Sequence, residues 1–368
     1  MAGVTLAPLR RIGGYNLSLV RSPYKVMIMS RQTLSPAPAV SLLTGLWFLF
    51  CLQPALAQPP RAPRPPDGPW NHQIHFATSA DGLRWDAGQQ PIMKQASVPD
   101  ILELSRDTPA GARGTLLVYT VDARDIGRRG GERISRLVST DGGQTWSRPA
   151  PILLDRRPGE GNTVDPSVVE LDDGRLRLYF YLMRQGPPRP GEPHRFYSAV
   201  SRDGLHFELE DGVRLESPNV TDPEVIRAGD EWLMFFTRRG DVLMARSADG
   251  LEFRTVPGFR VPRGGIPGAI AAGPAAVRLY LTGRGGITSA VYHLRTERLE
   301  PEPGARIPGP AADPSVWRRT GGGYVMIFKR WIRLPRRLPP RPRAAQSPPS
   351  SRSPSWSHSS RCSRSSGG

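Results

Sequence analysis

The chain has 368 residues, among them 40 prolines and 39 glycines, and a formal net charge of +17 at pH 7. Residues 1–57 and 329–368 hold 15 basic and no acidic side chains, whereas residues 58–328 hold 35 basic and 33 acidic ones. This nearly neutral central part excludes the basic footprint of a nucleic-acid-binding domain. The many turn-forming residues favour strands and turns over long helices.

A signal peptide is predicted at the N-terminus. The apolar run AVSLLTGLWFLFCL at 39–52 follows Arg31 and precedes Ala55-Leu56-Ala57. The run is shorter than the ~20 residues of a comfortable membrane span. We therefore expect cleavage after Ala57, a secreted or periplasmic protein, and no membrane span after cleavage. An uncleaved membrane anchor is the alternative.

The remaining chain divides into three segments. Residues 58–71 form a Pro-rich linker, and residues 72–331 hold the apolar strand patterns. Residues 332–368 form a basic tail rich in Ser and Pro, which we expect to be disordered. Both cysteines, Cys51 and Cys362, lie outside 72–331. The folded part therefore has no disulfide or Cys-based metal site, and we expect no metal and no cofactor.

Two short patterns alternate along residues 72–331. The first is a turn, found as TSADGLRW at 78–85, STDGGQTW at 139–146, VSRDGLHF at 200–207 and RSADGLEF at 246–253. The second is a strand opening, found as SVPDILEL at 97–104, VDPSVVEL at 164–171, TDPEVIRA at 221–228, ADPSVWRR at 312–319 and, more weakly, GIPGAIAA at 265–272. Each opening precedes a second apolar strand, and a third strand leads into the turn.

The repeating unit is thus a four-stranded meander, the blade of a β-propeller. Its five openings predict an all-β, five-bladed β-propeller, which we expect to be a monomer. The chain begins in the middle of a unit and ends in the middle of one. We therefore expect N-terminal strands to complete the C-terminal blade and so remove two exposed sheet edges. An open sandwich would not explain these two half-units.

The turn STDGGQTW resembles the Asp-box, or BNR repeat, of sialidases and their relatives. Within such a turn the Asp accepts backbone hydrogen bonds, and the Gly adopts a positive φ. We therefore interpret Asp81, Asp141, Asp203 and Asp249 as structural. The Arg-Ile-Pro element of sialidases should come early in the chain, but its only copy here is Arg306-Ile307-Pro308. No sialidase activity is inferred.

The strand opening, above all VDPSVVELDDGRLRLYFYL at 164–182, is similar to the blades of five-bladed glycoside hydrolases of the arabinanase, xylosidase and fructosidase group. The resemblance implies a base Asp in the first blade, an orienting Asp in the second and an acid Glu in the third. Asp165 matches the second-blade residue. Asp100 is the first-blade candidate, in a Pro-Asp rather than an Asp-Pro pair. Asp222 and Glu224 are both candidates for the acid, and neither matches the Glu-Gly-Pro of that group.

Propeller topology brings the starts of first strands and the ends of second strands to one face, which we call the mouth. Carboxyl groups there surround one channel, so mutual repulsion should raise some of their pKa values. A glycosidase acid needs a raised pKa, and arginine can bind sugar groups. The predicted catalytic residues are Asp100, Asp165, Asp222 and Glu224, and the predicted substrate-binding residues are Arg184, Arg238, Arg239, Arg284, Asp313 and Arg330.

Two functions remain open. The first is a carbohydrate-active propeller similar to glycoside hydrolases, which acts on or binds a polysaccharide or glycoconjugate at the mouth. The second is a non-catalytic propeller that binds glycans or protein partners, since the fold alone does not choose between them.

Overall fold

The computed structural model describes residues 68–126, 131–184 and 193–333, all within the compact unit Arg64–Gly368. The predicted signal peptide, residues 58–67 of the linker and the tail from residue 334 lie outside these ranges. Linker residues Pro69–Asn71 form a short 3-10 helix, η1. Ile332 and Arg333, assigned above to the tail, donate backbone hydrogen bonds to Asn71.

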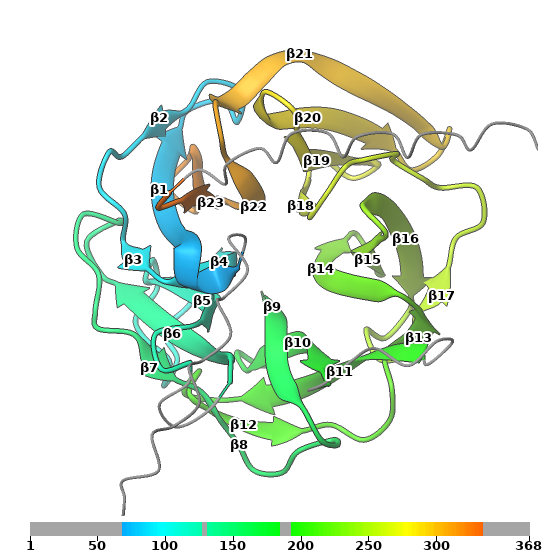
Figure 1. Cartoon of the computed structure of the whole chain (residues 1–368). Coiled ribbons are helices and arrows are strands. Elements are labelled where there is room, and N and C mark those ends of the chain that lie inside the picture. The colour runs from blue at the N-terminus through cyan, green and yellow to red at the C-terminus, as the bar shows by residue number, and fades with distance from the viewer. Residues whose placement is uncertain (1–67, 127–130, 185–192, 334–368) are drawn as a thin grey trace, which may run out of the picture. The chain divides into compact units, whose positions relative to one another are not determined.

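Five sheets surround a central axis, so the predicted five-bladed β-propeller is confirmed (Figure 1). Their strands pair antiparallel except for β8, which pairs with β12 in parallel. Blade 1 contains β4 (Ala96–Glu103), β5 (Leu116–Asp122), β6 (Arg133–Ser139) and β7 (Ala150–Pro151). Blade 2 contains β9 (Asn162–Glu170), β10 (Leu176–Met183), β11 (Pro193–Ser201) and β12 (His206–Leu209), with β8 (Leu153–Leu154) and β13 (Leu215–Pro218) at its edges. In each blade the first strand lies nearest the axis.

The other blades repeat this order. Blade 3 contains β14 (Val220–Ala228), β15 (Glu231–Arg238), β16 (Asp241–Ser247) and β17 (Arg254–Thr255). Blade 4 contains β18 (Gly268–Ala271), β19 (Ala276–Gly283), β20 (Gly286–His293) and β21 (Arg298–Pro308). Blade 5 contains β22 (Ala312–Arg318), β23 (Tyr324–Trp331), β1 (His72–Ser79) and β2 (Asp86–Ala87), with β3 (Met93–Lys94) at its edge. In this sheet β1 pairs with β23 from His72↔Trp331 to Ser79↔Tyr324.

The second strands are apolar on both faces because each sheet is packed between two others. Every residue of β5 is buried. Between blades 2 and 3, Tyr179 and Phe196 pack with Met234 and Phe236 in one apolar cluster. Continuous apolar runs are typical of strands that are covered on both sides. In the described part of the chain, no helix is long and apolar enough to span a membrane.

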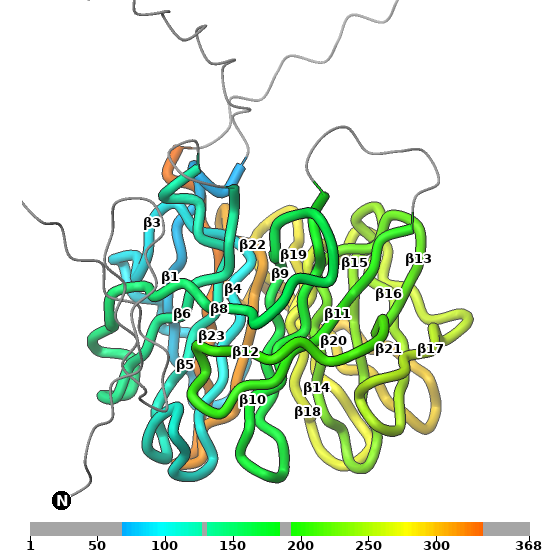
Figure 2. Tube along the Cα trace, turned by 90° about the horizontal axis from the view of Figure 1, so that it is seen from below, coloured from blue at the N-terminus to red at the C-terminus, as the bar shows by residue number. Residues whose placement is uncertain are grey.

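The Asp-containing turns lie at the face opposite the mouth, at one end of the tube in Figure 2. Each turn is fixed by its own hydrogen bonds, and the turns of blades 2, 3 and 5 are also bonded to the preceding blade. Asp203 accepts the N–H groups of Leu205 and His206, both at 2.8 Å. The buried Tyr119 hydroxyl of blade 1 donates to the carbonyl of Gly204 at 2.9 Å. Tyr179 and Tyr280 bond the Gly250 and Gly82 carbonyls in the same way. The turns therefore link blades as well as strands.

We expect Asp141→Asn to lower the melting temperature by a few degrees without changing glycan binding. Asp141 accepts hydrogen bonds from Ser139 Oγ at 2.7 Å and from the backbone N–H and hydroxyl of Thr145. These bonds hold the pKa of its carboxyl below the usual range, and an amide nitrogen cannot accept them. Differential scanning calorimetry beside the exposed control Asp230→Asn measures the effect. Equal melting temperatures would show that the turn contributes nothing.

Candidate functional site

The first strands begin with an irregular turn at the mouth. A register shift occurs near the recurring proline in blades 1, 2, 3 and 5. The residue before that proline has a positive φ, of 45° at Val98, 55° at Asp165 and Asp222, and 51° at Asp313. A left-handed backbone is uncommon for residues other than glycine, although aspartate adopts it more readily than valine, and such conformations gather at functional sites. Three of the four strained positions carry a carboxyl group.

Asp165, Asp222 and Asp313 form what we call the carboxyl cluster, from blades 2, 3 and 5. All three are buried. Burial raises the pKa of Asp165 well above its usual range, and the charges of Asp222 and Asp313 raise it further. Burial also raises the pKa of Asp222 to about 6, although hydrogen bonds from the Thr221 hydroxyl, at 2.6 Å, and from Asp165 oppose this.

A single lysine faces this cluster. Lys329 Nζ lies 2.7 Å from Asp313 Oδ2 and 5.2 Å from the ring centre of Trp331. Its charge lowers the pKa of Asp222. Glu132 adds a further negative charge that raises the pKa of Asp165. With more carboxyl groups than ammonium groups, burial and mutual repulsion favour the protonated forms of Asp165 and Asp222.

Asp100 and Glu224 lie in a different arrangement, which we call the inter-blade ring. They occupy the position after the recurring proline, and their equivalents are Ser167, Gly268 and Ser315. Each polar side chain of the ring accepts a backbone N–H from the next first strand around the axis. The bonds run from Val168 to Asp100 (2.5 Å), Val225 to Ser167 (2.9 Å), Ala269 to Glu224 (2.9 Å) and Ile101 to Ser315 (3.1 Å).

The fifth ring position has no side chain because the backbones meet there. A Cβ on Gly268 would lie 2.2 Å from the carbonyl oxygen of Pro314. Glycine permits this close approach. Asp100 additionally accepts the Ser315 hydroxyl at 2.6 Å. The structure therefore uses Asp100 and Glu224, both predicted catalytic residues, to join neighbouring first strands, and places only Asp165 and Asp222 in the carboxyl cluster.

Blade 1 lacks a carboxyl group at the strained position. Val98 stands where blades 2, 3 and 5 carry aspartate. The Pro-Asp order in blade 1 moves the carboxyl group two residues along the strand and into the inter-blade ring.

The predicted arginines lie at the ends of second strands or in the loops that follow them. Arg184, Arg238, Arg239 and Arg284 are exposed, and Arg330 is half-buried with its guanidinium 5.3 Å from the ring centre of Phe328. Asp313, predicted to bind substrate, is buried and paired with Lys329. No group of three His, Cys, Asp or Glu side chains within residues 68–126, 131–184 and 193–333 is placed to hold a metal ion.

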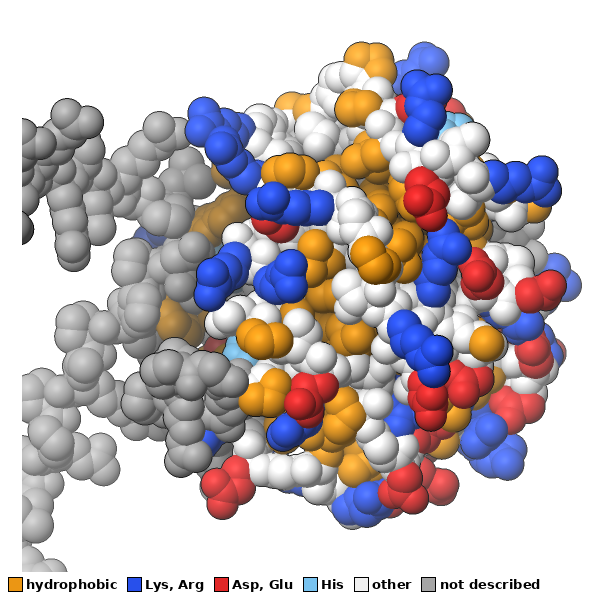
Figure 3. All heavy atoms as spheres, turned by 90° about the vertical axis from the view of Figure 1, so that its right-hand side faces the viewer, with side chains coloured by type: hydrophobic (Ala, Val, Ile, Leu, Met, Phe, Trp, Pro, Cys, Tyr) orange, Lys and Arg blue, Asp and Glu red, His pale blue; other side chains and the backbone are white. Residues whose placement is uncertain are grey.

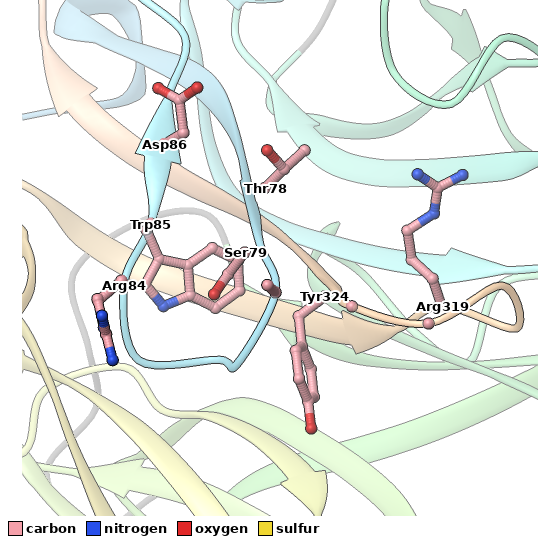
Figure 4. A pocket seen from close by; sticks show the side chains of 10 residues that line it. Thr78, Ser79, Arg84, Trp85, Asp86, Arg319 and Tyr324 are labelled. Atoms are coloured by element: carbon pink, nitrogen blue, oxygen red, sulfur yellow. The ribbon is translucent and has the colours of Figure 1, made fainter.

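A hollow of about 730 Å³ lies on the opposite face of the propeller. It is lined by the turn around Ser79 and Trp85 and by Arg319 and Tyr324 of blade 5 (Figure 4). Trp85 Nε1 donates to the Gly82 carbonyl and its ring packs edge-on against Tyr280. Trp85 is therefore fixed by the turn and by blade 4, and the hollow lies away from the carboxyl cluster at the mouth.

No profile of a known protein family matches the sequence, and no curated protein matches it. Among solved structures, the chain is similar to a protein of unknown function from Dyadobacter fermentans, with 17% identity, 74% and 86% of the two chains covered, and a TM-score of 0.48. It is also similar to a family 117 glycoside hydrolase from Zobellia galactanivorans, with 13% identity, 72% and 91% covered, and a TM-score of 0.43.

An α-L-arabinanase from Penicillium chrysogenum, complexed with arabinobiose, is similar at 14% identity, 74% and 87% coverage, and a TM-score of 0.46. Since these identities and TM-scores are low, no residue role is transferred from these proteins.

The sequence analysis did not identify Lys329, Thr221 or Glu132. Lys329 carried one usable signal, because it is one of only three lysines among 50 basic residues. Because nearly all basic residues of this chain are arginines, a lysine at the end of a second strand indicates that this position requires an ammonium group. A compact ammonium fits between buried carboxyl groups better than a planar guanidinium.

The pKa shifts predict an unusual pH dependence of stability. Four buried carboxyl groups have pKa values that are higher in the folded than in the unfolded protein: Asp100, Asp165, Asp222 and Glu224. Their protonation therefore stabilises the folded state at a pH below the ordinary carboxyl pKa. That contribution is lost as pH rises through about 6, the pKa of Asp100 and Asp222. The pKa values of Asp81 and Asp249 are instead lowered to about 2 in the folded protein. Their ionised forms stabilise the folded state, and this stabilisation is lost as the pH falls below about 4.

We therefore expect the melting temperature to be highest near pH 4 and to fall as the pH rises through about 6. Thermal unfolding from pH 3 to pH 8 measures this. Asp222→Asn should flatten the fall above pH 5. A melting temperature that rises steadily to pH 8 would contradict the raised pKa values.

Proposed function

We propose that the protein is a secreted or periplasmic, carbohydrate-active propeller that binds a glycoside at the mouth and acts on it through Asp165 and Asp222. The observation that carries the proposal is the meeting of these two carboxyl groups, from different blades, in one buried cluster where burial raises the pKa of both. Residues 57 positions apart in the sequence become neighbours there. A stability role alone does not require buried carboxyl groups on strained backbone.

The pair can perform the proton transfers of glycoside hydrolysis. The protonated member donates its proton to the glycosidic oxygen as the bond from that oxygen to the anomeric carbon breaks. The ionised member stabilises the positive charge that develops on the sugar or accepts a proton from the attacking water. Thr221 and Lys329 favour the ionised form of Asp222. Since the two groups interact strongly, their titration belongs to the pair.

Val98 favours the second candidate function, a glycan-binding propeller without turnover. It leaves blade 1 without a carboxyl group at the strained position, so all three cluster aspartates come from blades 2, 3 and 5. A hydrolase needs carboxyl groups on both sides of the scissile bond. If no carboxyl group lies on the far side of the scissile bond, the cluster would bind sugar hydroxyl groups without cleaving the glycoside.

A paired screen distinguishes these functions. Protein that begins at Gln58 is tested for turnover of aryl glycosides and polysaccharides, and for glycan binding by isothermal titration calorimetry. Turnover that requires Asp165 supports the hydrolase, whereas binding without turnover supports the second candidate. A protein that neither binds nor cleaves any glycan would contradict both.

A further inference from the structure

Five exposed arginines gather at the mouth on blades 3 and 4. We call them the basic patch: Arg238, Arg239, Arg260, Arg263 and Arg284. On the side of the molecule shown in Figure 3, blue side chains gather on the left, whereas red and blue alternate on the right. Arg238, Arg239 and Arg284 are among the substrate-binding residues predicted from the sequence, whereas Arg260 and Arg263 are not.

Backbone hydrogen bonds unite three loops into this surface. The β15–β16 hairpin tip carries Arg238 and Arg239, and the Gly265 N–H bonds its Gly240 carbonyl at 3.1 Å. The β19–β20 hairpin tip carries Arg284, and the Thr282 N–H bonds the Gly264 carbonyl at 2.9 Å. The segment with Arg260 and Arg263 therefore lies between two arginine-bearing tips.

Arg239 adopts a left-handed backbone, with φ +53°, beside Gly240 at φ +85°. A two-residue hairpin turn with two positive φ values favours Asn-Gly or Asp-Gly. Arginine at the first of these positions is strained, and it places a long cation at the tip. Strain of this kind indicates a functional side chain.

The patch is mostly unneutralised. Asp241 pairs with Arg260 at 2.6 Å and accepts the backbone N–H of Arg263. Among the described residues, no ion pair joins a carboxylate to Arg238, Arg239 or Arg284, although the charge of Arg238 lowers the pKa of Asp241. Three exposed guanidiniums are thus available to a ligand.

The patch adjoins the carboxyl cluster directly. The Asp313 N–H donates to Thr282 Oγ1 at 3.2 Å, and Thr282 lies two residues before Arg284. On the other side, Thr221, which bonds Asp222, pairs with Thr237, the residue before Arg238. A ligand of a few sugar units at the cluster would therefore reach the patch.

Resting on the proposed function, we propose that the glycan is anionic: its carboxylate or sulfate groups bind Arg238, Arg239 and Arg284, while the unit to be acted on lies at the carboxyl cluster. Guanidinium groups bind carboxylate and sulfate through paired hydrogen bonds. The nearly neutral charge of residues 58–328 argues against a general polyanion-binding protein. The two sources of the anion, uronate and sulfate, are separated by the probes below.

The test uses polygalacturonate, dextran sulfate and neutral arabinan, with binding measured by calorimetry at two salt concentrations. The variant Arg238→Gln/Arg239→Gln/Arg284→Gln is compared with Arg148→Gln/Arg202→Gln/Arg254→Gln. The control removes three exposed arginines outside the patch and changes the net charge equally. We expect the patch variant to lose about tenfold or more in affinity for one polyanion, and the control to lose less than about twofold.

The preferred probe identifies the anion as uronate or sulfate. If arabinan binds as tightly as either polyanion and the patch variant keeps full affinity, the ligand is neutral and this inference is overturned while the proposed function stands. If no glycan binds, the proposed function fails with it. The patch variant is also tested for binding to duplex DNA and to vesicles of anionic lipid. If it loses as much affinity for either of these as for the polyanionic glycan, the patch is a general anion-binding surface and the inference is overturned.

Discussion

Asp165→Asn is expected to reduce glycoside turnover by about 10²–10⁴-fold, the range typical of a lost general acid or base. The melting temperature should stay unchanged or rise, because burial and the Asp222 charge already oppose ionisation of this carboxyl. Asparagine is the informative replacement. It keeps the shape of aspartate and tolerates the left-handed φ of 55° at this position. An alanine would add backbone strain to the loss of the carboxyl group.

Asp222→Asn, at the same φ, should give a loss of similar size, since the two groups act as one pair. The double variant should lose little more than either single one. Turnover and melting temperature are measured together, with exposed Asp230→Asn as the control. Full turnover in Asp165→Asn, or a melting temperature that falls as far as in Asp141→Asn, would refute a catalytic role for this residue.

The sequence predicted the fold well because the repeat is local. Each turn such as STDGGQTW and each opening such as VDPSVVEL has its own hydrogen-bonding pattern, independent of the rest of the chain. Five copies then determine the number of sheets. The topology of a blade also places strand openings at one face, which is why Asp165 and Asp222 could be predicted to lie near each other.

The side-chain partners could not be predicted in the same way. Asp100 and Glu224 look like active-site carboxyl groups in sequence, but each lies one position after a proline rather than one before it. That shift of two residues turns the side chain toward the neighbouring first strand, where a backbone N–H group donates a hydrogen bond to it. Nor could spacing show that Lys329 faces Asp313, because their pairing depends on the register of β22 and β23.

The inter-blade ring explains why carboxyl and serine side chains alternate at one position of the repeat. What that position requires is an oxygen that accepts the next strand's N–H. Serine meets the requirement in blades 2 and 5, and a carboxylate meets it in blades 1 and 3. The ring therefore predicts which substitutions of Asp100 are tolerated.

Asp100→Ala is expected to lower the free energy of unfolding by about 2–4 kcal/mol, because it leaves the buried Val168 N–H and the Ser315 hydroxyl without their acceptor. Asp100→Ser should restore most of this loss, since Ser167 and Ser315 accept the equivalent N–H groups. Urea unfolding at pH 5, below the pKa of about 6 of Asp100, keeps removal of a buried charge from masking the effect. If Asp100→Ser folds stably and keeps turnover, Asp100 belongs to the ring alone. If it folds stably but loses turnover, the carboxyl group has a catalytic role and the assignment to the ring alone is wrong.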